Sequence, residues 1–239
     1  MAACRVEVVA STVEDVLAAA AGGANRVEFC THLASGGLTP GRSLTEQALA
    51  TAKQNGLGFR VLIRPREGEF VYTSLERQAI VSEAEAVLSI GADKVVCGGL
   101  LANGTVDLDL LTALDQAVGL DQVVFHRAFD EAADHAEARR QLKEAGIRTV
   151  LTSGGRPKAA EGLSAIEETV QSGLEVVAGS GVQPDQVADF IRVGAEAVHA
   201  SCRVPCDASE GRLFDAARTR VDETKVRALV EAVRAVARP

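Results

Sequence analysis

Acidic and basic side chains that could transfer protons occur at a few places along this chain. Glu28 lies within an apolar run, and residues 126–130 have the sequence His-Arg-Ala-Phe-Asp. A carboxyl group and an imidazole that meet in one cavity can give and take protons during a reaction. If the protein is an enzyme, Glu28, His126 and Asp130 are therefore the candidates for its catalytic acid and base.

A second group of residues has the chemistry needed to bind an anion. Guanidinium groups form paired hydrogen bonds with carboxylates and phosphates, and hydroxyl groups and glycine-rich turns supply further donors. The turn at 179–181, Gly-Ser-Gly, is of this kind, although a tight turn that needs positive φ would have the same sequence. The predicted ligand-binding residues are Glu7, Arg64, Arg66, Arg127, Thr152, Ser153, Gly179, Ser180, Gly181, His199, Ser201 and Arg203.

Glu7 and Glu28 differ from the other candidates because they occur within predicted strands and not after them. A carboxylate inside a protein core is costly unless it is paired, and the arginines at positions 64, 66, 127 and 203 are available partners. A structural ion network would explain both glutamates. A functional site would also explain them, since buried charges often mark one.

Thiols offer a third kind of chemistry, because Cys and His are ligands of Cu(I) and Zn(II). The five cysteines are odd in number and scattered, and we expect reduced thiols in place of disulfides. Cys30 and Cys97 are the candidate metal ligands, with His32 and Cys202 as helpers, whereas Cys206 has no assigned role. No spacing matches a Cys-x-x-Cys or His-Glu-x-x-His motif, and a buried cysteine is often only a small apolar residue.

The elements that must position these residues follow one repeated pattern. Seven times, an Ala-, Leu- or Glu-rich stretch ends at a glycine and a short β-branched run follows. Glycine closes a helix in the left-handed conformation, and a β-branched run suits a buried strand. With a first strand added, the predicted strands are 5–9, 26–30, 59–63, 94–97, 122–126, 149–152, 175–178 and 197–200.

Helical sequences separate these strands, at 13–21, 74–90, 107–118, 134–145, 159–172 and 185–193, and a last helix is predicted at 224–236. Alternating strands and helices imply a parallel sheet. Eight such units favour a (β/α)8 TIM barrel of the α/β class, with an extra C-terminal helix and a single domain over 1–239; an open doubly wound sheet is the alternative. The active site of such a barrel lies at the C-terminal ends of its strands, where most of the polar candidates occur.

Composition restricts the classes of function. A formal net charge of −8 argues against general nucleic-acid binding. An aromatic content of 3% leaves few side chains on which nucleic-acid bases could stack. No apolar run approaches the roughly 18 residues that cross a bilayer, and the N-terminus does not resemble a secretion signal. We therefore expect a cytoplasmic protein whose partners include neither nucleic acid nor membranes.

Seven strings of residues form a longer pattern, at 22–30, 35–40, 63–66, 125–130, 151–155, 179–182 and 199–201. Together they resemble the CutC family of copper homeostasis proteins; the most specific are Gly-Gly-Leu-Thr-Pro at 36–40 and His-Arg-Ala-Phe-Asp at 126–130. The resemblance implies a barrel, a cytoplasmic homo-oligomer (a dimer or tetramer) and copper handling through Cu(I). It assigns the family's cysteine after the second strand to Cys30.

Two functions follow from these observations. The first is a copper homeostasis protein that binds Cu(I) and needs no other cofactor. The second is an enzyme or binding protein for a small anionic metabolite, phosphorylated, carboxylated or sugar-like, held at the barrel mouth by the Glu, Arg, His and Asp side chains named above. The sequence leaves open whether the protein is an enzyme.

Overall fold

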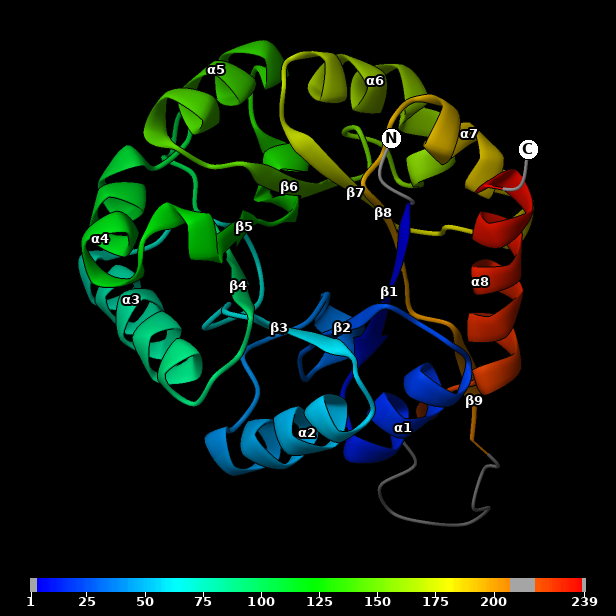
Figure 1. Ribbon diagram of the computed structural model, residues 1–239. Coiled ribbons are helices and arrows are strands. Elements are labelled where there is room, and N and C mark those ends of the chain that lie inside the picture. The colour runs from blue at the N-terminus through cyan, green and yellow to red at the C-terminus, as the bar shows by residue number, and fades with distance from the viewer. Residues whose placement is uncertain (1–3, 207–217, 238–239) are drawn as a thin grey trace, which may run out of the picture.

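Eight parallel strands form a closed barrel, which confirms the fold predicted from the sequence (Figure 1). A computed structural model of the chain describes residues 4–206 and 218–237. Each strand pairs with its neighbours in chain order, and the first strand pairs with the eighth. The strands are β1 (Arg5–Ala10), β2 (Arg26–Phe29), β3 (Gly58–Leu62), β4 (Lys94–Cys97), β5 (Val123–Phe125), β6 (Thr149–Thr152), β7 (Glu175–Gly179) and β8 (Ala197–Ala200).

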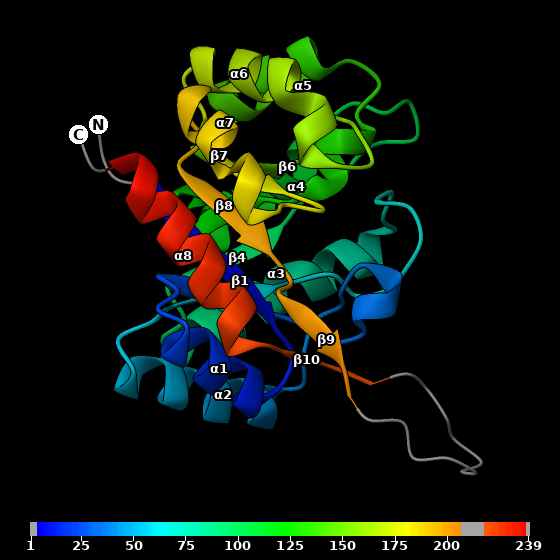
Figure 2. The ribbon, with the colours of Figure 1, turned by 90° about the vertical axis from the view of Figure 1, so that its right-hand side faces the viewer.

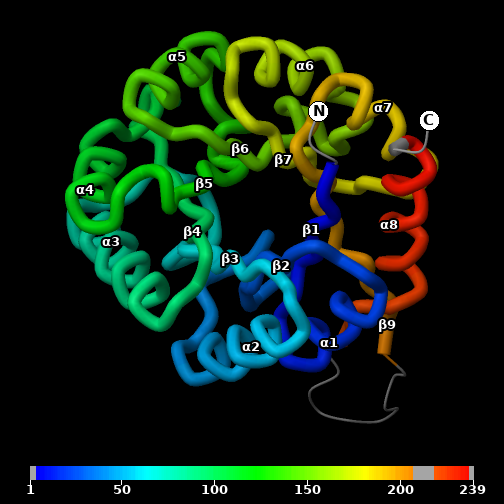
Figure 3. Tube along the Cα trace, viewed as in Figure 1, coloured from blue at the N-terminus to red at the C-terminus, as the bar shows by residue number. Residues whose placement is uncertain are grey.

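Helices surround the barrel, as the ribbon in Figure 1 and the tube in Figure 3 show. They are α1 (Val13–Ala21), α2 (Arg42–Gln54), α3 (Ser74–Ser89), α4 (Leu108–Val118), α5 (His135–Ala145), α6 (Leu163–Gln171), α7 (Val187–Arg192) and α8 (Glu223–Ala237). Within residues 4–206 and 218–237, no helix has the length and apolar character needed to cross a membrane.

The helix α2 has no counterpart among the predicted helices. Its buried face consists of Thr45, Ala48, Leu49 and Ala52, and only Leu49 is a large apolar residue. Small residues give a weak hydrophobic period, although they allow a helix to lie close to the sheet. The sequence pattern therefore did not predict α2, because the packing of α2 depends on the close fit of small residues more than on hydrophobicity.

Alternation of side chains along the strands divides the core into two parts. One apolar cluster fills the inside of the barrel and consists of Val9, Cys30, Leu62, Val96, Val124, Leu151, Val177 and Ala197. A larger cluster lies between the strands and the helices and includes Val8, Phe29, Val95 and Cys97. Residues that follow one another in a strand thus face different environments.

An antiparallel hairpin follows the barrel, formed by β9 (Arg203–Pro205) and β10 (Thr219–Val221). Figure 2 shows its two strands side by side, extending away from the barrel. The buried carboxylate of Asp15 in α1 accepts hydrogen bonds from the Arg203 guanidinium at 2.9 Å and the Val221 N–H at 2.8 Å. Asp15, which the sequence analysis does not single out, therefore fastens the hairpin to the barrel.

Candidate active site

A cavity of about 790 Å³ lies at the C-terminal ends of the strands. Its floor includes Val9, Cys30, Leu62 and Leu151 from the inner apolar cluster. The structure brings eleven of the predicted site residues together in its wall: Glu28, Cys30, His32, Arg64, His126, Arg127, Ser180, Gly181, His199, Ser201 and Arg203. The other predicted residues do not line this cavity: Glu7, Arg66, Cys97, Asp130, Thr152, Ser153, Gly179 and Cys202.

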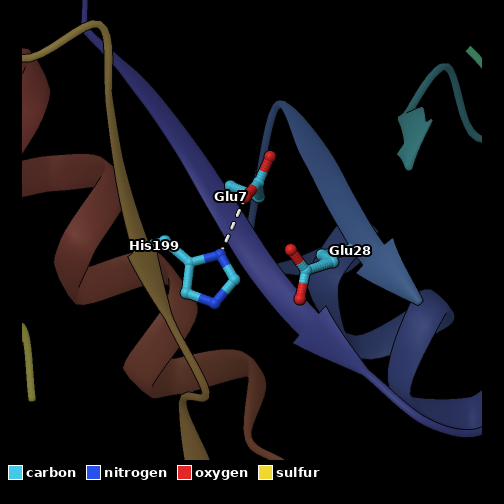
Figure 4. Close-up of side chains that lie close together, drawn as sticks. All are labelled: Glu7, Glu28 and His199. Carbon is cyan, nitrogen blue, oxygen red and sulfur yellow. Dashed lines mark hydrogen bonds and ion pairs between the residues drawn. The ribbon is translucent and has the colours of Figure 1, made fainter. Parts of the chain in front are cut away.

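Two carboxyl groups and an imidazole meet at one side of this cavity. Glu7 of β1, Glu28 of β2 and His199 of β8 each place a side-chain nitrogen or oxygen within 4.8 Å of the others (Figure 4). Barrel closure is what brings them together, because β1 lies between β2 and β8 and Glu7 is paired in register with His199. All three residues are among those predicted from the sequence, although Glu7 and His199 are 192 positions apart in the chain.

Glu7 is a buried ionised carboxylate. It accepts hydrogen bonds from Arg26 Nε and, at 3.0 Å, from Arg60 Nη1. Burial alone would raise the pKa of Glu7, but the charge of Arg26, the hydrogen bond from His199 and the charge of Arg60 hold it well below its usual range. Arg26 is itself fixed by two hydrogen bonds to Glu196, each 2.9 Å long.

The partners predicted for Glu7 were wrong. Arg64, Arg66, Arg127 and Arg203 lie elsewhere, and the ion pairs come from Arg26 and Arg60. Both arginines occur within strands, and a charged residue within a strand is the pattern that singled out the two glutamates. The same pattern would have identified Arg26 and Arg60 from the sequence.

His199 is oriented by Glu7. Its Nδ1 lies 2.7 Å from Glu7 Oε1, and because an ionised carboxylate can only accept, Nδ1 carries the proton. Burial lowers the pKa of His199, but the carboxyl groups of Glu28 and Glu7 outweigh it, so the net shift is upward. The second ring nitrogen, Nε2, has no part in this bond, and His199 is a residue of the cavity wall.

Glu28 has the most unusual environment of the three. Its Oε2 is buried and has no hydrogen-bond partner, although the residue lines the cavity. Burial raises the pKa of Glu28 to about 7, opposed in part by the neighbouring His199. A carboxyl group with a pKa near neutrality can serve either as an acid or as a base.

His126 and Arg64 occupy another part of the cavity wall. His126 Nδ1 accepts a hydrogen bond from the Ala128 N–H at 3.3 Å, and His126 Nε2 is buried without a partner. Arg64 donates from Nη1 to the carbonyls of Ser35 and Gly37 at 2.8 and 3.2 Å. Burial and the nearby Arg64 charge lower the pKa of His126 to about 3, so its ring is neutral.

Asp130 is the centre of a hydrogen-bond network outside the cavity. It accepts from the side chain of Thr152, the backbone N–H of Gly155, and both the N–H and the hydroxyl of Ser153. Arg127 donates to it at 2.7 Å. Because these donors occupy its lone pairs, Asp130 connects the loops after β5 and β6 through Thr152 and Ser153, and it does not line the cavity.

Arg66 and the glycine turn have local partners. Arg66 donates to Glu76 at 2.5 Å and to the carbonyls of Glu67, Glu69 and Val71, so it folds the loop after β3. In the turn after β7, Ser180 has a φ of 89° and Gly181 a φ of 67°, which supports the interpretation of this sequence as a turn that needs positive φ. Ser180 Oγ donates to the Pro157 carbonyl at 2.7 Å.

The two candidate metal-binding thiols do not share a site. Cys30 faces the inside of the barrel, whereas Cys97 belongs to the cluster between strands and helices. Among the described residues, the only His, Cys, Asp and Glu side chains grouped closely enough to hold one ion are Glu7, Glu28 and His199. Two carboxylates and one imidazole do not form the soft donor set that Cu(I) prefers, and the Glu7 charge is already balanced by arginines.

The remaining thiols give no second soft ligand in this wall. Cys202 is buried in the outer apolar cluster, and burial raises its pKa to about 11. Burial raises the pKa of Cys97 to about 12 and also raises that of Cys30. Because the thiolate is the metal ligand, each of these thiols would have to lose its proton at a cost.

Comparison with known proteins identifies the relatives of this chain. Residues 4–204 match the sequence pattern of the CutC family. The chain is 38% identical over 203 residues to a CutC family protein of Xylella fastidiosa, covering 83% of this chain and 74% of that protein. It is 33% identical over 239 residues to a CutC family protein of Rhizobium meliloti, covering 96% of each.

Solved structures agree with the sequence comparison. The crystal structure of CutC from Streptococcus agalactiae superposes with a TM-score of 0.77 at 26% identity, over 83% of this chain and 98% of that one. Thiamine phosphate pyrophosphorylase from Pyrococcus furiosus superposes with a TM-score of 0.63 at 17% identity, over 97% and 96%, and shares the fold alone. From its residue pattern, its relatives and its barrel, this chain belongs to the CutC family.

Proposed function

We propose that this protein is an enzyme that transfers protons on a small polar metabolite held at the mouth of the barrel. The observation that carries the proposal is Glu28, a buried carboxyl group in the cavity wall with an unpartnered oxygen and a pKa raised to about 7. Strongly shifted acids in cavities are characteristic of acid–base catalysts. The cavity volume of about 790 Å³ suits a small molecule.

His199 and Glu28 have complementary roles in the proposed proton transfer. Glu7, fixed by Arg26 and Arg60, keeps the His199 ring in one orientation with its proton on Nδ1. His199 Nε2 is then free to give or take a proton. Glu28 as a carboxylate removes a proton from the ligand, and the imidazolium of His199 returns one, so the pair supports proton transfer in both directions.

Deuterium exchange tests this function without a known substrate. We would incubate the protein in D2O with small hydroxy-, oxo- and carboxylate-bearing compounds and follow loss of C–H signals by proton NMR. We expect the parent protein to exchange a C–H of at least one compound, and Glu28→Gln to slow that exchange by about 100-fold or more. Glu46→Gln, the same change on the exposed surface of α2, should exchange at the parent rate.

The direct readout is the carboxyl group itself. Infrared difference spectra of the parent and Glu28→Gln, recorded as a function of pH, isolate the titration of Glu28. A pKa near 4, as in an exposed glutamate, together with no exchange in any compound, would contradict the proposal.

Copper binding is a second candidate, supported by Cys30 in the cavity wall and by the S. agalactiae relative, which is described as a copper homeostasis protein. Anaerobic titration against a colorimetric Cu(I) probe tests it. Cys30→Ser should then lose binding, whereas Cys97→Ser, a change on the opposite side of the strands, should keep it. Equal affinity of Cys30→Ser and the parent would exclude Cys30 as a ligand.

A further inference from the structure

A buried hydrogen-bond donor beside the cavity, Nε2 of His126, has no acceptor among the described residues. Arg64 lies in the same wall, and its guanidinium interacts with the buried Tyr72 hydroxyl. A buried donor without a partner is costly, and native structures seldom leave one without a functional reason. Since His126 lines the cavity, a bound molecule would supply the missing acceptor.

His126 is held in the form that donates from Nε2. The residue is only 3% exposed, and its Nδ1 accepts the Ala128 N–H. The acceptor role of Nδ1 requires the proton of the neutral ring to lie on Nε2. The Arg64 charge nearby further disfavours a second proton on this ring.

Arg64 is held equally firmly. Its Nη atoms are used by the carbonyls of Ser35, Gly37 and Gly68, with the last bond 2.7 Å long. Phe70 lies against both side chains, with its ring centre 4.9 Å from the Arg64 guanidinium carbon and 4.8 Å from the centre of the His126 ring. His126 and Arg64 therefore belong to one preorganised part of the wall.

We propose that His126 and Arg64 bind a planar oxygen-bearing group of the substrate, a carbonyl or carboxylate next to the carbon that loses its proton. This inference rests on the proposed function and adds a substrate class to it. The C–H bond breaks, the proton goes to the Glu28 carboxylate, and the electron pair moves onto the carbonyl oxygen. The resulting enolate oxygen accepts from His126 Nε2–H and is stabilised by the positive charge of Arg64, and reprotonation of carbon reverses the step.

Nitrogen NMR of histidine tests this subsite directly, because the chain has only four histidines. The probes are oxalate, a planar dicarboxylate that resembles an enolate, and inorganic phosphate, which is tetrahedral. We expect the His126 ring to be the neutral Nε2–H form between about pH 5 and about pH 8. Oxalate should move the His126 Nε2–H proton downfield, and phosphate should not.

Variants separate the subsite from the acid–base pair. Removing the donor in His126→Phe should weaken oxalate binding about tenfold or more, whereas His126→Gln, which offers an N–H at a similar reach, should stay within a few-fold of the parent. Glu28→Gln should bind oxalate like the parent although it no longer exchanges deuterium.

Three results would overturn the inference: no effect of oxalate on the His126 resonances at millimolar concentration, a response to phosphate alone, or unchanged oxalate affinity in His126→Phe. None of these three results depends on deuterium exchange by Glu28. Conversely, an ordinary pKa for Glu28 with intact oxalate binding at His126 would remove the proposed function and leave an oxyanion-binding site.

Discussion

The protonation state of Glu28 affects both the chemistry of the cavity and the stability of the fold. Its pKa of about 7 lies above the roughly 4.3 of a glutamate in an unfolded chain, so the folded protein holds this proton more tightly. The folded state therefore binds more protons than the unfolded state between these two values. The free energy of unfolding must fall as pH rises through this window.

Glu28→Gln removes this dependence, because an amide cannot ionise. We expect urea unfolding to show that the stability of the variant relative to the parent rises by on the order of 3 kcal/mol between about pH 4 and about pH 8. Above the folded pKa, the difference should be constant. A difference that is the same at every pH would mean that Glu28 titrates alike in both states.

Glu7 has the opposite role, since its charge is needed inside the barrel. Glu7→Gln leaves Arg60 without the carboxylate to which it donates, and leaves Arg26 with Glu196 only. Breaking a buried ion pair in this way should cost about 3–5 kcal/mol in urea unfolding and should lower the pKa of His199 as seen by NMR. Glu46→Gln on the surface should cost less than about 1 kcal/mol; equal effects of the two variants would contradict the account.

At the scale of elements, the Asp130 network joins the 3₁₀ segment Arg127–Glu131 to the loop after β6. Asp130→Asn replaces an acceptor-only group with one that also donates, so some of the N–H and hydroxyl donors lose their partner. We expect faster amide hydrogen exchange at Ser153 and Gly155 and a loss of about 1–3 kcal/mol of stability.

The same variant should leave the chemistry of the cavity alone, because Asp130 is not in its wall. The pKa of Glu28 should match that of the parent. Asp185→Asn, at an exposed residue, is the control for the substitution itself. A changed Glu28 pKa in Asp130→Asn would mean that the loops after β5 and β6 also position the acid–base pair.

The strands were predictable because their composition differs so clearly from that of the helices, and β4, β6 and β8 begin and end where the sequence analysis expected. It was not predictable whether the last side chain of each strand points into the barrel or toward the helices. Cys30 directly follows β2 and Cys97 is the last residue of β4, but Cys30 points into the barrel and Cys97 toward the helices. Strand length and register decide this, and a shift of one residue exchanges the two faces.

The site was predictable to a similar degree. Glu28, His126 and His199 line one cavity as expected, because the ends of parallel strands must meet. Asp130, Thr152 and Ser153 have equally suitable chemistry but bond to one another. Local hydrogen bonds of this kind depend on loop conformation, which the alternation of strands and helices does not specify.

At the scale of the whole molecule, α8 completes the outer layer by packing against α1. Gly22, at the end of α1, has ordinary helical φ and ψ, but a Cβ there would lie 2.5 Å from Cβ of Val226. Gly22→Ala should therefore displace α8 and lower the free energy of unfolding by about 1–3 kcal/mol. Gly41→Ala, where a Cβ would meet nothing within 4 Å, should lower it by less than about 1 kcal/mol, a cost that comes only from the N-cap position of Gly41 in α2.

The inner apolar cluster limits the route by which a ligand can reach the cavity. Val96, Val124, Val177 and Ala197 belong to that cluster without lining the cavity, so they support the floor formed by Val9, Leu62 and Leu151. Arg26, Arg60 and Glu7 hold charges inside the barrel, so a ligand cannot pass through its filled interior. Substrate and product therefore both pass through the mouth of the cavity, and we expect accumulated product to compete with fresh substrate there.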